Sequence, residues 1–341
     1  MRTLLLVAAV ALLAVGCKPE NPTAISQKSN AGKVFRVGYQ KGGALQLLRV
    51  EGDLDKRLAQ EGVKVEWVQF ASAPPMLEAI GVGSLDIGSG GDGPLVFAQA
   101  AGHDIALLAN TPPGDNDSRG VIVPANSPAK SLSDLKGKRI AVTKGTGTHN
   151  FLIQALDRAG VNYSQIQPIY LSPPDARAAF DAGKVDAWAA WDPYLTVATK
   201  ATGARTLVNG GGITTAGGFY FSTKTFARQH PEWVKALLEE VDKKSTWLWQ
   251  HPKEAAQTLS PVLNVDVATL EAINRNTAHG RQYVGFRPVE GEVIKAQQLV
   301  ADNFFRVGLL PKKIDVRETL LTEKEYAAIL PDVSAKKVAG K

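Results

Sequence analysis

Two glycine-containing loops carry the groups best suited to bind an anion. Residues 33–38 (KVFRVG) favour a β-strand, which leads into the loop 39–43 (YQKGG) and a helical pattern from Ala44. Residues 138–142 (KRIAV) favour another strand, followed by the loop 143–150 (TKGTGTHN) and a helical pattern from Phe151. A helix that starts behind such a loop presents free N–H groups and a positive dipole end, and glycine lets an anion approach the backbone.

Both loops are rich in hydrogen-bond donors, which narrows the chemistry of the ligand. A sulfonate offers only acceptor oxygens, whereas a phosphonate monoanion carries a hydroxyl that also needs an acceptor. The loops therefore predict an anion site and favour sulfonate, with nitrate and carboxylate left open. His149 either bonds the ligand or makes a hydrogen bond at the start of its helix. The candidate ligand-binding residues of these loops are Gln40, Lys41, Gly42, Gly145, Thr146, Thr148, His149 and Asn150.

The repeat continues downstream of each loop. Residues 75–80 (PMLEAI) and 174–180 (PDARAAF) both predict a helix that starts at proline. Each is followed by Gly-x-aliphatic-Asp, at 83–86 and 183–186, and by a second aspartate six positions further on. This order predicts two α/β lobes of similar topology. Because ligands collect at the carboxyl ends of strands in such sheets, the loops 39–43, 89–93, 143–150 and 190–194 are expected to face one cleft.

The later loops add further candidates. We expect Trp191 rather than Trp188 to line the cleft, because Trp191 stands at the end of its strand. Asp92 and Asp192 cannot face an anion cheaply, so they either orient loop N–H groups or accept from an amine of the ligand. The candidate ligand-binding residues added here are Gly91, Asp92, Trp191, Asp192 and Gly218.

Several other classes of function lack support in the sequence. Residues 88–93 (GSGGDG) match G-x-G-x-x-G, but they lie on a later strand and Pro94 follows at once, which argues against a dinucleotide site. The five histidines are scattered and no nucleophile–base set is evident, so we expect no metal, no cofactor and no catalytic residues. The net charge of +6 comes without a dense basic run, and we expect no binding of nucleic acid.

The N-terminus predicts export. Met1-Arg2 precedes an apolar run at 4–15 and then Gly16-Cys17, which is the pattern of a secretory signal. The run is shorter than the roughly 20 residues that a membrane-spanning helix needs. Residues 13–17 (LAVGC) resemble a bacterial lipobox, and this resemblance implies that Cys17 is lipidated and anchors the protein to a membrane. Residues 1–16 are therefore the expected signal peptide and 17–32 a polar tether.

The remaining chain is long enough for two lobes. We predict lobe 1 from 33–115 and 224–325, lobe 2 from 116–223, and a C-terminal tail at 326–341. Further helices are expected at 231–248, 252–259, 267–278 and 290–304, packed on lobe 1. The chain would cross between lobes near 114–116 and again after 219–221, so that a hinge could close the cleft.

Many short segments resemble the periplasmic aliphatic-sulfonate-binding proteins of ABC transporters. The resemblance implies a two-lobed type II periplasmic-binding-protein clamshell of mixed sheets flanked by helices, with no cofactor and no catalysis. It also implies a monomer that delivers a sulfonate to a permease with a cytoplasmic ATPase. The chain departs from the group at Gly43-Ala44, at 146–148 (TGT) and at Gly91. Taurine, a sulfate ester, nitrate or a pyrimidine therefore remain alternative ligands, and a ligand-sensing lipoprotein an alternative role. The similar segments are 37–42 (VGYQKG), 67–70 (WVQF), 76–79 (MLEA), 97–102 (FAQAAG), 135–137 (LKG), 144–146 (KGT), 149–150 (HN), 175–180 (DARAAF), 185–188 (VDAW), 191–194 (WDPY) and 311–313 (PKK).

Overall fold

The computed structural model describes residues 33–112, 118–213, 217–278, 285–286 and 289–331. The predicted signal peptide, the tether with Cys17 and the first predicted crossing at 114–116 lie outside the described residues. Within the described part, no helix is both long and apolar enough to cross a bilayer.

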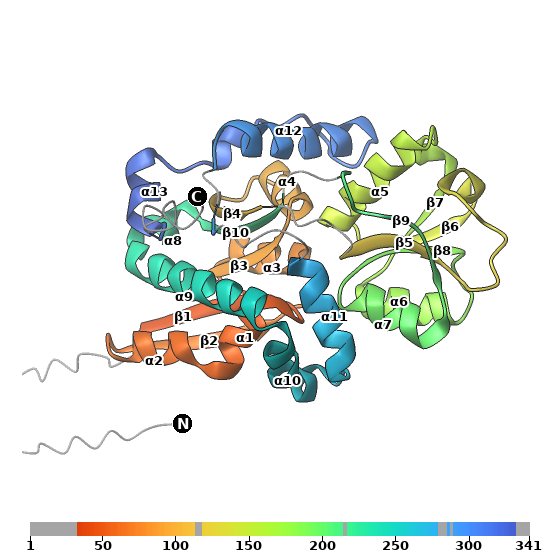
Figure 1. Cartoon of the computed structure of the whole chain (residues 1–341). Helices are drawn as coiled ribbons and strands as arrows, with labels where there is room; N and C mark the ends of the chain where they lie inside the picture. The colour runs from red at the N-terminus through yellow and green to blue at the C-terminus, as the bar shows by residue number, and fades with distance from the viewer. Residues whose placement is uncertain (1–32, 113–117, 214–216, 279–284, 287–288, 332–341) are drawn as a thin grey trace, which may run out of the picture. The chain divides into compact units, whose positions relative to one another are not determined.

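The described strands form two five-stranded sheets of matching topology (Figure 1). In each sheet the strand in the fourth position runs antiparallel to its neighbours, and it is the first strand after the chain crosses into that sheet. This match confirms the repeat inferred from the sequence. The first sheet has the order β2 (Val63–Gln69), β1 (Lys33–Tyr39), β3 (Ile87–Gly91), β10 (Gly218–Thr223), β4 (Ile105–Thr111). The second has the order β7 (Gln167–Tyr170), β6 (Arg139–Val142), β8 (Ala187–Trp191), β5 (Arg119–Val123), β9 (Arg205–Asn209).

An equivalent pair of residues holds the two central strands together in each sheet. The Asp86 carboxylate accepts from the backbone N–H of Arg36 at 2.6 Å, and the N–H of Asp86 donates to the Arg36 carbonyl at 3.1 Å. Asp186 makes the same two contacts with Arg139, at 2.8 Å each. The Gly-x-aliphatic-Asp signature therefore fixes where β3 and β8 begin relative to β1 and β6.

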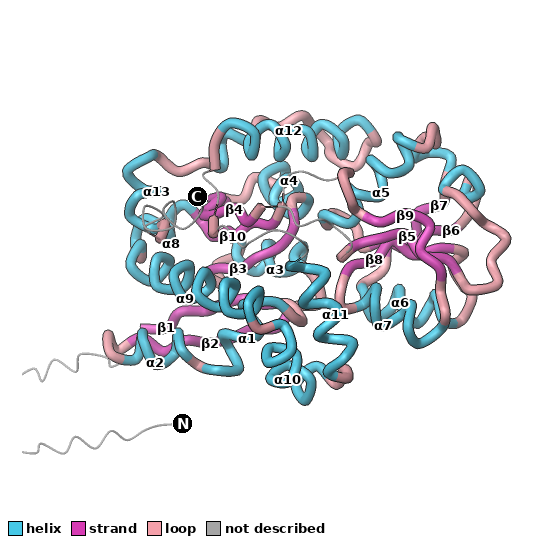
Figure 2. Tube along the Cα trace, viewed as in Figure 1, coloured by secondary structure: helices cyan, strands magenta, loops and turns pink. Residues whose placement is uncertain are grey.

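Helices fill the connections between strands, as Figure 2 shows. Several begin with a proline in the first turn, where its missing N–H costs nothing. The four helices predicted in the C-terminal part are confirmed within a few residues. The helices are α1 (Gly43–Glu51), α2 (Asp53–Ala59), α3 (Ala73–Gly81), α4 (Gly93–Ala100), α5 (Gly147–Arg158), α6 (Pro173–Asp181), α7 (Tyr194–Thr202), α8 (Lys224–Gln229), α9 (Pro231–Gln250), α10 (Pro252–Leu263), α11 (Val267–Ala278), α12 (Gly291–Arg306) and α13 (Glu323–Ile329).

Helix α12 packs against helices of both sheets. It contacts α4, which follows the first sheet's β3, and α5, which follows the second sheet's β6. The ring of Phe304 on α12 lies 4.9 Å from the ring of Phe97 and 5.3 Å from that of His149. One apolar cluster consequently includes buried residues from both sheets. We call this contact of α4, α5 and α12 the seam.

Two predicted boundaries were wrong. Residues 219–221 were assigned to lobe 2, but they lie in β10, which pairs with β3 and β4 of the first sheet. The second crossing therefore precedes β10, between Asn209 and Gly218. The predicted tail from 326 begins inside α13, where Ile329 is buried and the Tyr326 hydroxyl donates to the Leu107 carbonyl at 2.8 Å. Burial of apolar side chains thus holds this helix on the first sheet.

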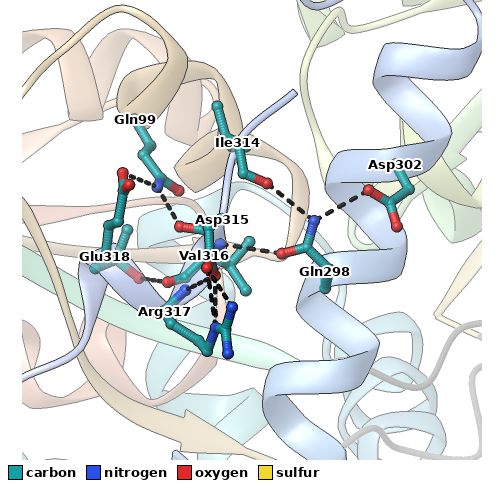
Figure 3. Close-up of polar contacts among 9 residues, drawn as sticks. Gln99, Gln298, Asp302, Ile314, Asp315, Val316, Arg317 and Glu318 are labelled. Carbon is teal, nitrogen blue, oxygen red and sulfur yellow. Dashed lines mark hydrogen bonds and ion pairs between the residues drawn. The ribbon is translucent and has the colours of Figure 1, made fainter. Parts of the chain in front are cut away.

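The segment that leads to α13 is held between α4 and α12 (Figure 3). The Gln99 amide donates to the Asp315 carbonyl at 2.6 Å. From α12, Gln298 accepts from the N–H of Val316 at 3.1 Å and donates to the Ile314 carbonyl at 3.0 Å. These backbone contacts fix 314–316 without any strand partner, and they tie the end of α12 to the first sheet.

Candidate ligand-binding site

A cavity of about 380 Å³ lies where the ends of strands from both sheets meet. This size falls within the range of small-molecule sites. Nine of the thirteen predicted ligand-binding residues line it: Gln40, Lys41, Gly42, Gly91, Thr146, Thr148, Trp191, Asp192 and Gly218. The cavity wall does not include Asp92, Gly145, His149 or Asn150.

Two cations line the cavity, the exposed Lys41 and the partly buried Arg119, and Arg119 was not among the residues predicted from the sequence. It is the first residue of β5 and lines the cavity. Its guanidinium makes no hydrogen bond or ion pair with any described residue. Burial lowers the pKa of Arg119, and the nearby Asp92 carboxylate acts in the opposite direction. A buried guanidinium without a partner has unmet donors in a planar fork, which suits an oxyanion.

The internal repeat contained a signal for Arg119. In the sheet register Arg119 stands opposite Trp191, just as Gly218 stands opposite Gly91 in the other sheet. Arg119 and Gly218 are thus equivalent positions of the two lobes. Extending the repeat to the crossing strands would have identified Arg119 alongside Gly218. Without that step, an arginine behind a polar, Asp-containing segment resembles an ordinary surface residue.

The first turn of α5 faces the same cavity. Thr146 caps this helix: its hydroxyl accepts from the N–H of His149 at 3.2 Å and donates to the Thr143 carbonyl at 2.8 Å. The N–H groups of Gly147 and Thr148 make no backbone hydrogen bond, as expected for the first positions of a helix. The Thr148 hydroxyl also has no partner among the described residues. Three donors of α5 therefore remain available next to Arg119.

Glycines allow loops of the two sheets to approach one another here. A Cβ on Gly147 would stand 2.6 Å from Oδ1 of Asp92, and one on Gly93 would stand 2.5 Å from the Thr146 carbonyl oxygen. A Cβ on Gly91 would stand 3.2 Å from Cα of Gly147. The loop after β3 and the start of α5 are therefore in backbone contact, and any larger side chain would separate them.

The four predicted residues that do not line the cavity lie behind it. The Asn150 amide donates to Oδ2 of Asp92 at 3.0 Å, and Gln297 of α12 donates to the Asp92 carbonyl at 2.8 Å. Asn303 of α12 donates to the Asn150 amide oxygen at 3.3 Å. Burial raises the pKa of Asp92, while Arg119 and Asn150 oppose that rise. The Asp92 carboxylate thus bonds the first turn of α5, and its predicted roles, to orient loop N–H groups or to accept from an amine of the ligand, stay predictions.

His149 supports the anion loop from the side away from the cavity. Its Nδ1 accepts from the N–H of Gly145 at 3.1 Å, so the neutral ring carries its proton on Nε2. Nε2 then donates to the Tyr163 hydroxyl, 2.6 Å away. Burial, together with nearby Lys144, lowers the pKa of His149 to about 3. The bond to Gly145 agrees with the predicted alternative of a structural hydrogen bond at the helix start.

The end of β8 and the loop that follows it build the part of the cavity wall next to Arg119, which pairs with Trp191 across the sheet. Trp191 lines the cavity and its ring meets that of Tyr194 edge-on, at 5.8 Å. Trp188 is only 1% exposed and packs in the core, as the sequence led us to expect. Oδ1 of Asp192 accepts from the N–H of Thr196 at 2.9 Å, and burial raises the pKa of Asp192. Asp192 therefore caps the start of α7.

The first glycine loop, 39–43, contributes an amide, a lysine and two glycines to the cavity wall. Gln40 lines the cavity, and its amide nitrogen donates to the Ser89 carbonyl at 3.0 Å, which ties the end of β1 to β3. Lys41 is exposed at the rim. Gly42 has a φ of 84°, a backbone conformation that only glycine adopts readily. Among the described residues, no group of histidine, cysteine, aspartate and glutamate could hold a metal ion.

Comparison with known proteins gives a consistent result. Residues 58–255 match the family described as NMT1/THI5 like. A protein of Escherichia coli (strain K12) named for binding aliphatic sulfonates is 35% identical, over 94% of this chain and 97% of that protein. A counterpart from Bacillus subtilis (strain 168) is 33% identical, over 93% of each chain. The structure of the alkanesulfonate-binding protein of Xanthomonas axonopodis pv. citri, bound to MOPS, superposes with a TM-score of 0.79 at 37% identity, covering 84% of this chain and 98% of that one.

Two sheets of matching topology around one cavity, together with the structural neighbours, identify the fold as that of a periplasmic substrate-binding protein. The relatives are transport proteins and not enzymes, in agreement with the prediction of a binding function. The chain belongs to the NMT1/THI5-like family. The fold inferred from the sequence is confirmed by the same comparisons.

Proposed function

We propose that this protein captures an organosulfonate and delivers it to the permease of an ABC importer, whose ATPase is cytoplasmic. The observation that carries this proposal is Arg119, a partly buried guanidinium with no partner among the described residues, which lines the same cavity as the free donors of Gly147 and Thr148. The names of the relatives, which bind aliphatic sulfonates, support the choice of headgroup.

The charges around the cavity favour a ligand with a single negative charge. One guanidinium can compensate one negative charge, and Asp92 already contributes a negative potential to Arg119. The other cation that lines the cavity, Lys41, is exposed at the rim and therefore compensates a second negative charge on the headgroup less well than Arg119 compensates the first. A sulfonate is singly charged and has no proton to donate, so it matches this set of donors better than sulfate or phosphate.

Isothermal titration calorimetry of the mature protein tests the proposal. The ligands are ethanesulfonate, butanesulfonate, taurine, sulfate and nitrate. We expect at least one sulfonate to bind with a Kd below about 1 mM, which corresponds to roughly 4 kcal/mol, and sulfate to bind more weakly. Binding of nitrate or sulfate without any sulfonate would replace the proposed ligand by another anion. A folded protein that binds none of the five would overturn the function.

The membrane anchor is a separate part of the proposal. The lipobox-like segment 13–17 supports lipidation of Cys17, with 17–32 as a tether that holds the binding protein near its permease. The periplasmic relatives support export. Cys17→Ser should release the protein from the membrane fraction of the producing cell and remove the mass of the acyl groups. An unchanged membrane fraction and mass would contradict lipidation.

We also propose that the two sheets close on the ligand as lobes of a monomer. The chain passes from the first sheet to the second after β4 and returns before β10, and this double connection together with the seam at α12 supports motion about one edge of the cavity. Small-angle X-ray scattering should show a smaller radius of gyration when a saturating sulfonate is added, with the mass of one chain in both states. An unchanged radius would argue against closure.

A further inference from the structure

Part of the cavity lining is aliphatic and is not used by the predicted anion loops. Five aliphatic side chains make up this part, and all come from the C-terminal helices. We call this set the aliphatic wall. It consists of Leu248 of α9, Leu259 and Leu263 of α10, and Leu270 and Ile273 of α11.

The aliphatic wall is a preformed surface. Its residues belong to one apolar cluster that also includes Leu47 of α1. Asn264 ends α10 in a left-handed conformation, with a φ of 54°, and α11 starts at Val267. The Asn274 amide of α11 donates to the carbonyl of Pro252 at the start of α10, at 3.0 Å. Figure 1 shows α10 next to α1, and α11 packs against α10.

The wall also touches the second sheet's helices. Helix α11 contacts α7, and Lys200 of α7 donates to the Thr269 hydroxyl at 2.9 Å. Thr269 in turn donates to Asp266 at 2.5 Å, which fixes the first turn of α11. These contacts hold the aliphatic wall in place relative to Trp191 and Asp192, which line the same cavity from the second sheet.

A hydrated headgroup gains nothing from aliphatic neighbours, whereas a hydrocarbon chain does, by about 0.8 kcal/mol per buried methylene. We propose that the aliphatic wall binds the apolar tail of the ligand and sets the preferred tail length. This inference rests on the proposed function, because it assumes that the sulfonate occupies the end of the cavity near Arg119. Under this proposal the helices α9, α10 and α11 determine which tail is preferred. The two glycine loops bind the headgroup that all these ligands share.

The test compares tail lengths on the wild-type protein and on matched variants. The dissociation constants of methanesulfonate, butanesulfonate and hexanesulfonate are measured by calorimetry. For the wild type we expect about fourfold tighter binding per buried methylene until the wall is covered. Leu263→Ala and Ile273→Ala should reduce the ratio of methanesulfonate Kd to hexanesulfonate Kd by at least about fourfold. Both should leave methanesulfonate binding within about twofold of the wild type.

Leu47→Ala is the matched control. Leu47 is buried in the same cluster but does not line the cavity, so this variant should lose stability and keep the wild-type ratio. The wild-type series is informative even if a variant does not fold. A flat series, in which all three sulfonates bind equally, overturns the role of the wall and leaves the headgroup site intact. Wall variants with the wild-type ratio also overturn it. If no sulfonate binds, the proposed function fails and the inference fails with it.

Discussion

The side-chain amide of Asn150 donates to the carboxylate of Asp92 at 3.0 Å, and both residues are buried. Asn150 belongs to α5 behind the second sheet's β6, and Asp92 follows β3 of the first sheet. The other end of the same amide accepts from Asn303 of α12. The Asn150 amide thus needs both its donor and its acceptor for its two contacts in the seam.

Asn150→Asp should destabilise the protein at neutral pH. It places a second carboxylate beside Asp92 in a buried site, and we expect a loss of roughly 3–5 kcal/mol of unfolding free energy, as for other uncompensated buried charges. The loss should shrink as the pH falls, because one proton shared by the two carboxylates removes the repulsion. Urea unfolding at pH 7 and pH 5 measures both effects. Asn162→Asp, at an exposed cap, is the control and should change little. Equal stability of Asn150→Asp and the wild type at pH 7 would contradict the expected repulsion between the new carboxylate and that of Asp92.

Arg119→Gln should weaken sulfonate binding without weakening the fold. Hydrogen bonds to a charged group contribute about 1.5–3 kcal/mol, so we expect a Kd roughly 10- to 150-fold higher by calorimetry. The melting temperature should stay the same or rise, since a buried guanidinium without a partner opposes folding. Arg119→Lys should recover part of the affinity. Arg158→Gln, which removes an exposed guanidinium on α5, should bind as the wild type does. Unchanged sulfonate binding by Arg119→Gln would show that the anion does not bind next to the start of β5.

The two threonines of the anion loop should separate binding from stability. Thr148→Val removes a hydroxyl that has no protein partner, so it should raise the sulfonate Kd by about 2- to 10-fold at unchanged melting temperature. Thr146→Val removes the α5 cap and the bond to Thr143, and should cost about 1 kcal/mol of stability. Calorimetry and thermal unfolding of both variants provide the comparison. A Thr148→Val variant that loses stability but binds the sulfonate as the wild type does would contradict the assignment of Thr148 to ligand binding.

The protein should lose stability below pH 6.5 because of His149. The folded-state pKa of His149 is about 3, against 6.5 when unfolded. Between these values the unfolded chain binds one more proton, so stability falls by about 1.4 kcal/mol per pH unit as the pH decreases. His149→Gln should remove this part of the slope, as measured by urea unfolding from pH 7 to pH 4. Tyr163→Phe keeps His149 and should retain the slope at lower overall stability. A wild-type slope in His149→Gln would exclude His149 as its source.

The sequence repeat predicted the loops of the site well, because strand–loop–helix order is a local property. It also distinguished Trp191 from Trp188, since alternation along a strand is local too. Which residue of a loop faces the cavity was harder to predict. Thr148 and His149 are neighbours, yet one lines the cavity and the other packs behind it. That difference depends on the exact residue at which α5 begins.

Features that depend on pairing over long distances could not be read locally. Arg119 reaches the cavity only because β5 lies next to β8 in a particular register. The helices of the aliphatic wall were expected to pack on lobe 1, and their part in the cavity was not predicted, because an apolar helix face has the same pattern whether it meets other side chains or a cavity. The second crossing was misplaced because β10 has the composition of any buried strand, and only its partners assign it to the first sheet.

The position of β10 has a consequence for biogenesis. The second sheet comes entirely from 119–209, whereas β4 of the first sheet has β10 as its only neighbour among the described strands. A chain that emerges N-terminus first therefore completes the second sheet while β4, which is almost wholly buried in the finished protein, still lacks its partner. Pulse-labelled hydrogen exchange should protect β5 to β9 before β4. Until residue 223 has been translocated, the newly exported chain presents an open apolar strand edge, and its yield should depend on chaperones that prevent aggregation.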